Sequence, residues 1–234
     1  MAARPIASWK RCRSPRSRTL RWTRPRPGCV NGWIGPTLAA TPEAFHWQAA
    51  SRLIDEYPLA WVISRAFSAS PLPLLAERDE DGMVVSLLGH CSRRNSLVKD
   101  FASDPAGLIL FNGPDGFVSN DLVSERNWGA TWNYAAARFE VEIELVEDET
   151  EEAINRLLEH MQGLGEDRWT TAELAERYQG MLRAIVAFRA HIRRFVPAFK
   201  LGQGEQADAF EEIVNGHPNR DLAQWMRAFH EAGG

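Results

Sequence analysis

Residues 139–145 read FEVEIEL, in which apolar and acidic side chains alternate without a break. Successive side chains of a β-strand point to opposite faces, so this period of two predicts a strand with one buried face and one face in water. The pattern can be followed back to Thr131. We therefore expect residues 131–145 to form either a pair of strands or one long bent strand.

Short apolar segments precede this strand. They occupy residues 59–66, 72–76, 83–89, 108–111 and 117–119. Turn dipeptides separate several of them, namely Asp81-Gly82, Gly113-Pro114 and Asp115-Gly116. Short strands joined by tight turns, with a single short helix predicted at 95–101 between two of them, indicate an antiparallel barrel or sandwich.

Helical patterns lie mainly towards the two ends. A start signal at Thr41-Pro42-Glu43 predicts a first helix that ends at Tyr57-Pro58. Further helices are predicted at 149–162, 170–182, 206–215 (closed by Gly216) and 220–230 (capped by Asn219). Residues 185–196 alternate again and are predicted to be a strand. The expected class is α+β, an antiparallel β-barrel with flanking helices at the N- and C-terminal ends.

The first 36 residues differ from the rest in composition. Nine basic residues and no acidic ones precede Glu43, which leaves 18 basic against 31 acidic residues in the remainder. Three interpretations are open: a basic arm that contacts nucleic acid or an acidic surface, a transit peptide, or a disordered or untranslated extension. We favour the last, and expect residues 1–36 to be an extension and residues 37–234 to form the single domain.

The remaining global features exclude several classes. No segment approaches the ~18 consecutive apolar residues of a membrane span, so a soluble protein is expected. The three cysteines, Cys12, Cys29 and Cys91, are odd in number and lack metal-ligand spacing, which favours the reducing cytoplasm. The six histidines show no metal-ligand spacing either, so no metal site is expected. Phosphate-binding loops, HExxH, CxxC and GxSxG are absent, and no catalytic residue is assigned.

Three segments are candidates for binding. Residues 89–95, GHCSRRN, place two arginines before a short helix, which suits a phosphate group; the alternative is a solvated loop with a Ser or Asn cap. Residues 129–134, GATWNY, could form a platform for a flat ring, or simply contribute to a strand core. Residues 199–204, FKLGQG, could donate from a lysine and a glutamine, or form an ordinary loop. Taken singly, the residues favour the second interpretation in each case.

In combination the segments resemble the PaiB-type family of FMN-binding split-barrel proteins. The chain carries GHCSRRN at 89–95, FNGP at 111–114, ATWNY at 130–134 and KLGQ at 200–203, in the order of that family's GH-x-A-R-x-N, F-x-GP, PTWNY and K-L-S-Q segments. The similarity spans roughly residues 42–230. The chain departs from the family pattern at Asn120, Ala130 and Gly202.

The resemblance implies an FMN-binding split barrel that forms a homodimer, with FMN in a groove between subunits. The phosphate would then lie near Arg93, Arg94 and Asn95, beside His90. The ring would lie near Trp132, Asn133 and Tyr134, with Thr131, Lys200 and Gln203 close by. These ten residues are the expected cofactor-binding set.

Three functions remain open on this resemblance. The first is a flavin-dependent oxidoreductase or flavin reductase that uses NAD(P)H. The second is a non-enzymatic regulator of transcription or a flavin sensor, and the third is a member that has kept the barrel and lost FMN. The acidic body and the lack of a helix-turn-helix pattern argue against direct contact with nucleic acid.

Overall fold

In the computed structural model, residues 42–163 and 169–233 are described. The alternating stretch lies in β5 (Thr131–Leu145), which is one continuous strand rather than two. Its alternate side chains are buried from Asn133 to Ile143, as the period of two predicts. The expectations for residues 1–36 and for the Thr41 cap fall outside the described residues.

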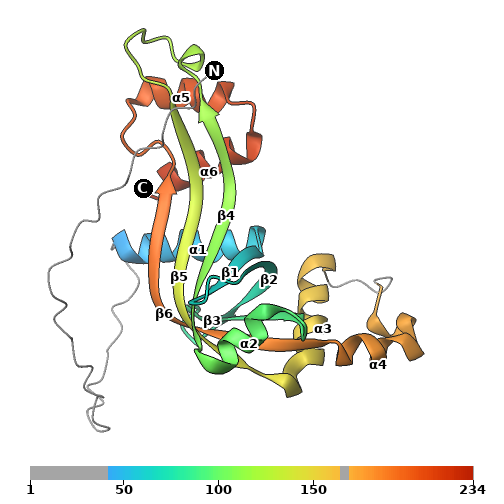
Figure 1. Cartoon of the computed structure of the whole chain (residues 1–234). Helices are drawn as coiled ribbons and strands as arrows, with labels where there is room; N and C mark the ends of the chain where they lie inside the picture. Colours follow the sequence, from blue (N-terminus) through green and yellow to red (C-terminus); the bar gives the residue numbers. More distant parts are fainter. Residues whose placement is uncertain (1–41, 164–168, 234) are drawn as a thin grey trace, which may run out of the picture. The chain divides into compact units, whose positions relative to one another are not determined.

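Six antiparallel strands close into a barrel (Figure 1). The other five are β1 (Leu59–Ser64), β2 (Ala69–Arg78), β3 (Val84–Ser92), β4 (Ala106–Val118) and β6 (Ile185–Lys200). Their order around the barrel is β1-β2-β3-β6-β5-β4. The predicted α+β class with an antiparallel β-barrel is therefore confirmed.

Large apolar side chains fill the barrel. Ile109, Phe111 and Phe139 are completely buried, and Phe188 is nearly so. The packing leaves no room beside Gly89, where an added Cβ would lie 2.4 Å from Leu74 Cδ2. A glycine at this position of β3 is therefore required by close approach of the core and not by a ligand.

Helices flank the barrel, as predicted. They are α1 (Pro42–Glu56), α2 (Ser96–Ser103), α3 (Thr150–Gln162), α4 (Glu176–Arg183), α5 (Ala207–Gly216) and α6 (Arg220–Glu231), together with the 3₁₀ helices η1 (Asn120–Leu122), η2 (Glu147–Glu149) and η3 (Thr171–Leu174). Figure 1 shows α5 and α6 beside the far ends of β4, β5 and β6. None of the helices in the described ranges is long and apolar enough to cross a membrane.

Four boundaries differ from the sequence-based expectation. The segments 108–111 and 117–119 belong to the single strand β4, because Gly113-Pro114 causes a register shift and not a turn. The helix predicted at 170–182 is broken at Ala175, whose φ is +45°. Strand β6 continues past residue 196 to Lys200. Gly216 is the last residue of α5, and His217 is the cap.

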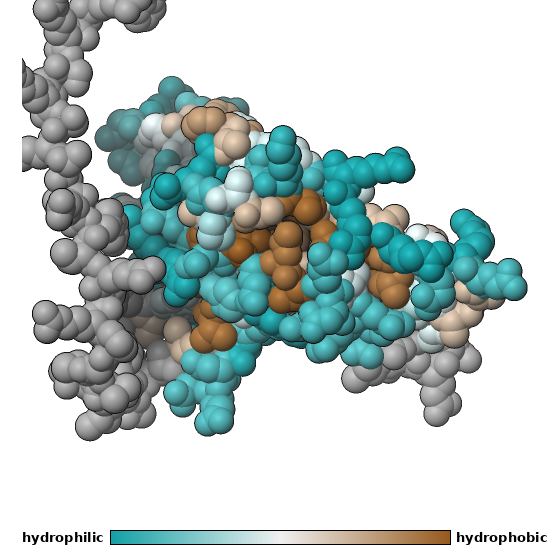
Figure 2. All heavy atoms as spheres, turned by 60° about the horizontal axis from the view of Figure 1, so that its bottom comes forward, coloured by the Kyte–Doolittle hydropathy of each residue, from teal (hydrophilic) through white to brown (hydrophobic). Residues whose placement is uncertain are grey.

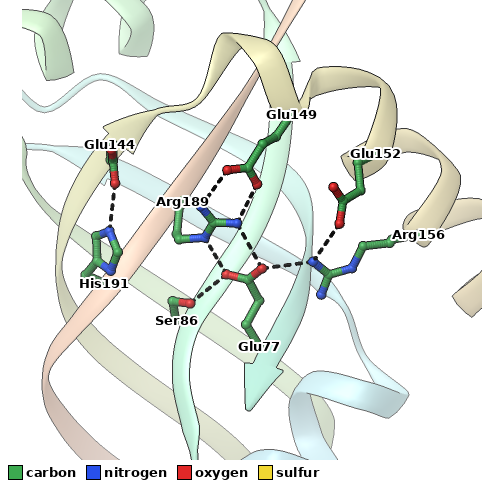
Figure 3. Close-up of polar contacts among 8 residues, drawn as sticks. All are labelled: Glu77, Ser86, Glu144, Glu149, Glu152, Arg156, Arg189 and His191. Atoms are coloured by element: carbon green, nitrogen blue, oxygen red, sulfur yellow. Dashed lines mark hydrogen bonds and ion pairs between the residues drawn. The ribbon is translucent and has the colours of Figure 1, made fainter. Parts of the chain in front are cut away.

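Buried ion pairs fasten α3 and η2 to the barrel (Figure 3). The Glu77 carboxylate of β2 accepts from Arg189 Nε at 2.7 Å, from Ser86 Oγ at 2.6 Å and from Arg156 Nη1 at 2.9 Å. Arg189 also donates to Glu149 Oε2 at 2.6 Å. Burial opposes ionisation of Glu77, but these hydrogen bonds outweigh it and lower its pKa to about 2.

Candidate functional site

The segment 89–95 forms the end of β3 and a tight loop that leads into α2; we call residues 92–95 the arginine loop. Asn95 is the N-cap of α2, and its side chain accepts from Leu97 N at 3.1 Å. The Asn95 amide also donates to Ser70 Oγ at 2.9 Å. The short helix at this position was predicted, but Asn95 acts as its cap and its side chain is committed to the fold.

The two arginines of this loop differ in their partners. Arg93 Nη1 donates to Glu147 Oε2 of η2 at 2.9 Å, whereas Arg94 forms no hydrogen bond or ion pair with any other described residue. Arg94 is exposed, so its guanidinium is available to an anion. His90 lies half-buried in β3, where burial lowers its pKa.

The segment 129–134 lies at the opposite end of the sheet. Trp132 and Tyr134 point outward from β5 with 51% and 38% of their surfaces exposed. Phe117 of β4, 53% exposed, faces Trp132 with 6.0 Å between ring centroids. We call Phe117, Trp132 and Tyr134 the aromatic tip. The sequence pattern identified two of its members and missed Phe117, which only the β4–β5 register places there.

Two polar contacts hold the aromatic tip in shape. Trp132 Nε1 donates to Asp115 Oδ1 at 2.9 Å. Lys200, the last residue of β6, pairs with Tyr134 across the strands and donates from Nζ to Thr131 Oγ1. Three of the ten predicted residues, Thr131, Trp132 and Tyr134, thus lie together with Lys200.

The other two predicted residues of this end have structural roles. Asn133 points into the core, 1% exposed, where its amide contacts Met226 Sδ at 3.5 Å. Gln203 closes its own turn, since its side chain accepts from Leu201 N at 2.7 Å and donates to Phe199 O at 2.8 Å. Neither side chain is directed at a ligand surface.

The arginine loop and the aromatic tip are far apart within one chain. Ser92 pairs with Ile185 at the first residue of β6, and Tyr134 pairs with Lys200 at its last. Sixteen residues of strand at about 3.3 Å each give a path of ~50 Å. In Figure 1 the strand bends, yet α2 and η1 still lie at opposite ends of the sheet. A mononucleotide cannot span that distance.

An apolar surface lies between these two ends. Figure 2 shows that apolar side chains reach the surface in a patch bordered by hydrophilic ones. On the outside of β1, Leu59 is 61% and Trp61 45% exposed, and Trp61 pairs with Leu110 of β4 and Pro71 of β2. We define the apolar outer face as Leu59, Trp61, Ile63, Pro71, Leu108 and Leu110. Alternation in β1 could have revealed it, because both faces of that strand are apolar.

The basic residues of β6 are paired with acidic residues of β5. Arg194 contacts Glu140, Arg193 contacts Glu142 and His191 contacts Glu144, with N–O distances of 3.3, 2.6 and 3.0 Å. This ladder along the wet face of the two strands neutralises the cluster. It offers no excess positive charge for a nucleic acid backbone.

The cavity between α1 and the β2–β3 turn has a volume of about 520 Å³. Trp47, Ser51, Asp55 and Met83 are among the residues that line it. None of its lining residues belongs to the arginine loop, the aromatic tip or the ten predicted positions. An enclosed single-chain flavin pocket is therefore not what brings those positions together.

Comparison with known proteins identifies relatives. The family described as "Putative FMN-binding domain" matches residues 40–194. The protease synthase and sporulation protein PAI 2 of Bacillus subtilis (strain 168) is 24% identical over 155 residues, which cover 65% of this chain and 73% of the relative.

Solved structures with a similar fold include two larger families of names. The FAD and heme binding protein of Mycobacterium smegmatis is 21% identical, with a TM-score of 0.49 and coverage of 72% of this chain and 77% of that one. The flavocytochrome Anf3 of Azotobacter vinelandii is 13% identical, with a TM-score of 0.42 and coverage of 71% and 78%.

Proposed function

The chain belongs to the FMN-binding domain family, and from this premise we propose that it binds FMN in a site shared by two copies of the chain. In each site the arginine loop of one copy holds the phosphate, and the aromatic tip of the other copy receives the isoalloxazine ring. The observation that carries the proposal is the placement of these two groups at opposite ends of β6.

The chemistry of both groups suits the cofactor. The exposed Arg94 guanidinium can donate two hydrogen bonds to a phosphate dianion, and a planar donor fork fits phosphate well. Phe117, Trp132 and Tyr134 expose aromatic faces on which a flat heteroaromatic ring can stack. Lys200, beside Tyr134, supplies a cation for a ring carbonyl.

A second copy explains the apolar outer face. Exposed contiguous apolar side chains on a soluble protein mark an interaction surface. Two copies that join through this face about a two-fold axis run their strands in opposite directions. The arginine loop of one copy then lies toward the aromatic tip of its partner, and both composite sites form at once.

Bound flavin would supply redox chemistry, and the candidate activity is an oxidoreductase or flavin reductase that takes its electrons from NAD(P)H. The chain's own residues bind and orient: Arg94 fixes the phosphate, Trp132 supports the ring and Lys200 stabilises negative charge at the ring edge. A cytoplasmic setting fits Cys91, whose thiol is buried and unpaired, with a pKa raised by burial to about 11.

The test is the visible spectrum of the purified protein with and without added FMN. We expect flavin absorption that survives desalting, with FMN released on denaturation, followed by FMN-dependent oxidation of NAD(P)H. FMN binding without NAD(P)H oxidation would favour the flavin-sensing alternative. A colourless protein that ignores added FMN would contradict the proposed function.

A further inference from the structure

One carboxylate stands where a phosphate would be expected to bind. Glu147 Oε2 accepts from Arg93 Nη1 at 2.9 Å, although the two residues are 54 positions apart in the chain. The Arg93 backbone N–H donates to Ala184 O at 2.9 Å, which fixes the base of the side chain. Arg93 is thus directed at η2 and not at solvent beside Arg94.

The short helix η2 holds this carboxylate in place. Its third residue, Glu149, accepts two hydrogen bonds from Arg189, at 3.0 and 2.6 Å. Arg189 is anchored in turn by Glu77 (Figure 3). Because η2 is tethered through Glu149, Glu147 stays within reach of Arg93.

Carboxylate and phosphate oxygens compete for the same guanidinium donors. A phosphate in the arginine loop must displace Glu147 from Arg93 or bind through Arg94 alone, with a carboxylate nearby. We propose that Glu147 is a specificity-determining residue that weakens the hold of the arginine loop on the phosphate of FMN and so keeps the cofactor exchangeable. This inference rests on the proposed function, because it assigns a phosphate to the loop.

The test compares FMN with riboflavin, which lacks the phosphate, in the full-length protein. Glu147→Gln removes the competing charge and should tighten FMN binding about two- to fivefold, the range expected for a half-exposed ion pair. Riboflavin affinity should not change. In the Arg93→Ala background, Glu147→Gln should give no gain.

Asp148→Asn is the matched control. It removes the same charge from the same η2 helix, and Asp148 has no ion pair among the described residues. Equal effects of Glu147→Gln and Asp148→Asn, or a gain for riboflavin as well, would overturn the inference while leaving FMN binding in place. Failure of the wild type and every variant to bind either flavin would overturn the proposed function, and this inference with it.

Discussion

Trp132 donates its indole N–H to the carboxylate of Asp115, at 2.9 Å, from β5 to the neighbouring strand β4. The contact fixes an aromatic side chain that is half exposed, which is unusual for a residue of this size. The strand that carries Asp115 is itself anchored to the C-terminal helices, because Asn219 Nδ2 donates to Asp115 O at 3.0 Å and His217 lies 3.2 Å from Phe117 O. The aromatic tip is therefore a preformed surface.

Arg94→Ala should weaken FMN binding by about 1–3 kcal/mol, or roughly 5- to 150-fold, because one charge-assisted phosphate contact is lost. Riboflavin binding should be unaffected. The measurement is a flavin titration followed by fluorescence. Arg177→Ala, on the exposed surface of α4, is the control for loss of one arginine. Unchanged FMN affinity in Arg94→Ala would remove this residue from the site.

Glu77→Gln should lower the free energy of unfolding at pH 7 by about 2–3 kcal/mol, because the folded-state pKa of Glu77, about 2, lies well below its ordinary value. The Glu77 contribution is fully present above the unfolded-state pKa and is lost as pH falls toward 2. The stability gap between wild type and variant should therefore close between roughly pH 4.5 and pH 2. Urea denaturation across that range measures it.

Glu142→Gln is the matched control for this prediction. Glu142 also pairs with an arginine, Arg193, but half of its side chain is exposed to water. The cost there should stay below about 1 kcal/mol. If both variants lost the same stability, the network around Glu77 would have no special role.

Gly202→Ala should destabilise the protein by about 1–3 kcal/mol. Gly202 has φ +89°, and an added Cβ would lie 3.1 Å from Phe210 and 3.2 Å from Met226. Gly204→Ala, two residues on, meets no atom within 4 Å and should cost little. Thermal unfolding of the two variants provides the comparison, and a neutral Gly202→Ala would be the contrary result.

Trp61→Glu should convert a dimer into a monomer and reduce FMN binding, because it buries a charge in the apolar outer face. Met181→Glu, which alters an equally exposed apolar side chain on α4, should change neither property. Analytical ultracentrifugation reports the mass, and a flavin titration reports the affinity. A wild-type monomer that binds FMN would argue against the shared site.

Local patterns predicted most of the fold. Alternation identified β5 and β6, and the cap at Asn95 was visible as a short helix start, because these depend on neighbours in sequence. Gly113-Pro114 misled, since a bulge inside a long strand has the same composition as a turn.

The candidate site was harder to predict for a different reason. Motif spacing grouped the arginine loop with the aromatic tip, but their separation follows from strand register, which depends on pairing across the barrel. For the same reason no local signal indicated that Glu147 would meet Arg93, or that Asn133 would point into the core.

The shared site is tested most directly by mixing two variants that each lack one half of it. Arg94→Ala chains and Trp132→Ala chains, each weak in FMN binding alone, are denatured and refolded together. In a dimer of one copy of each, one site has both mutations and the other has neither. The account predicts that FMN binding of wild-type affinity returns in about a quarter of the sites. If the mixture binds no better than its two components, the site is not shared between copies and the central claim is wrong.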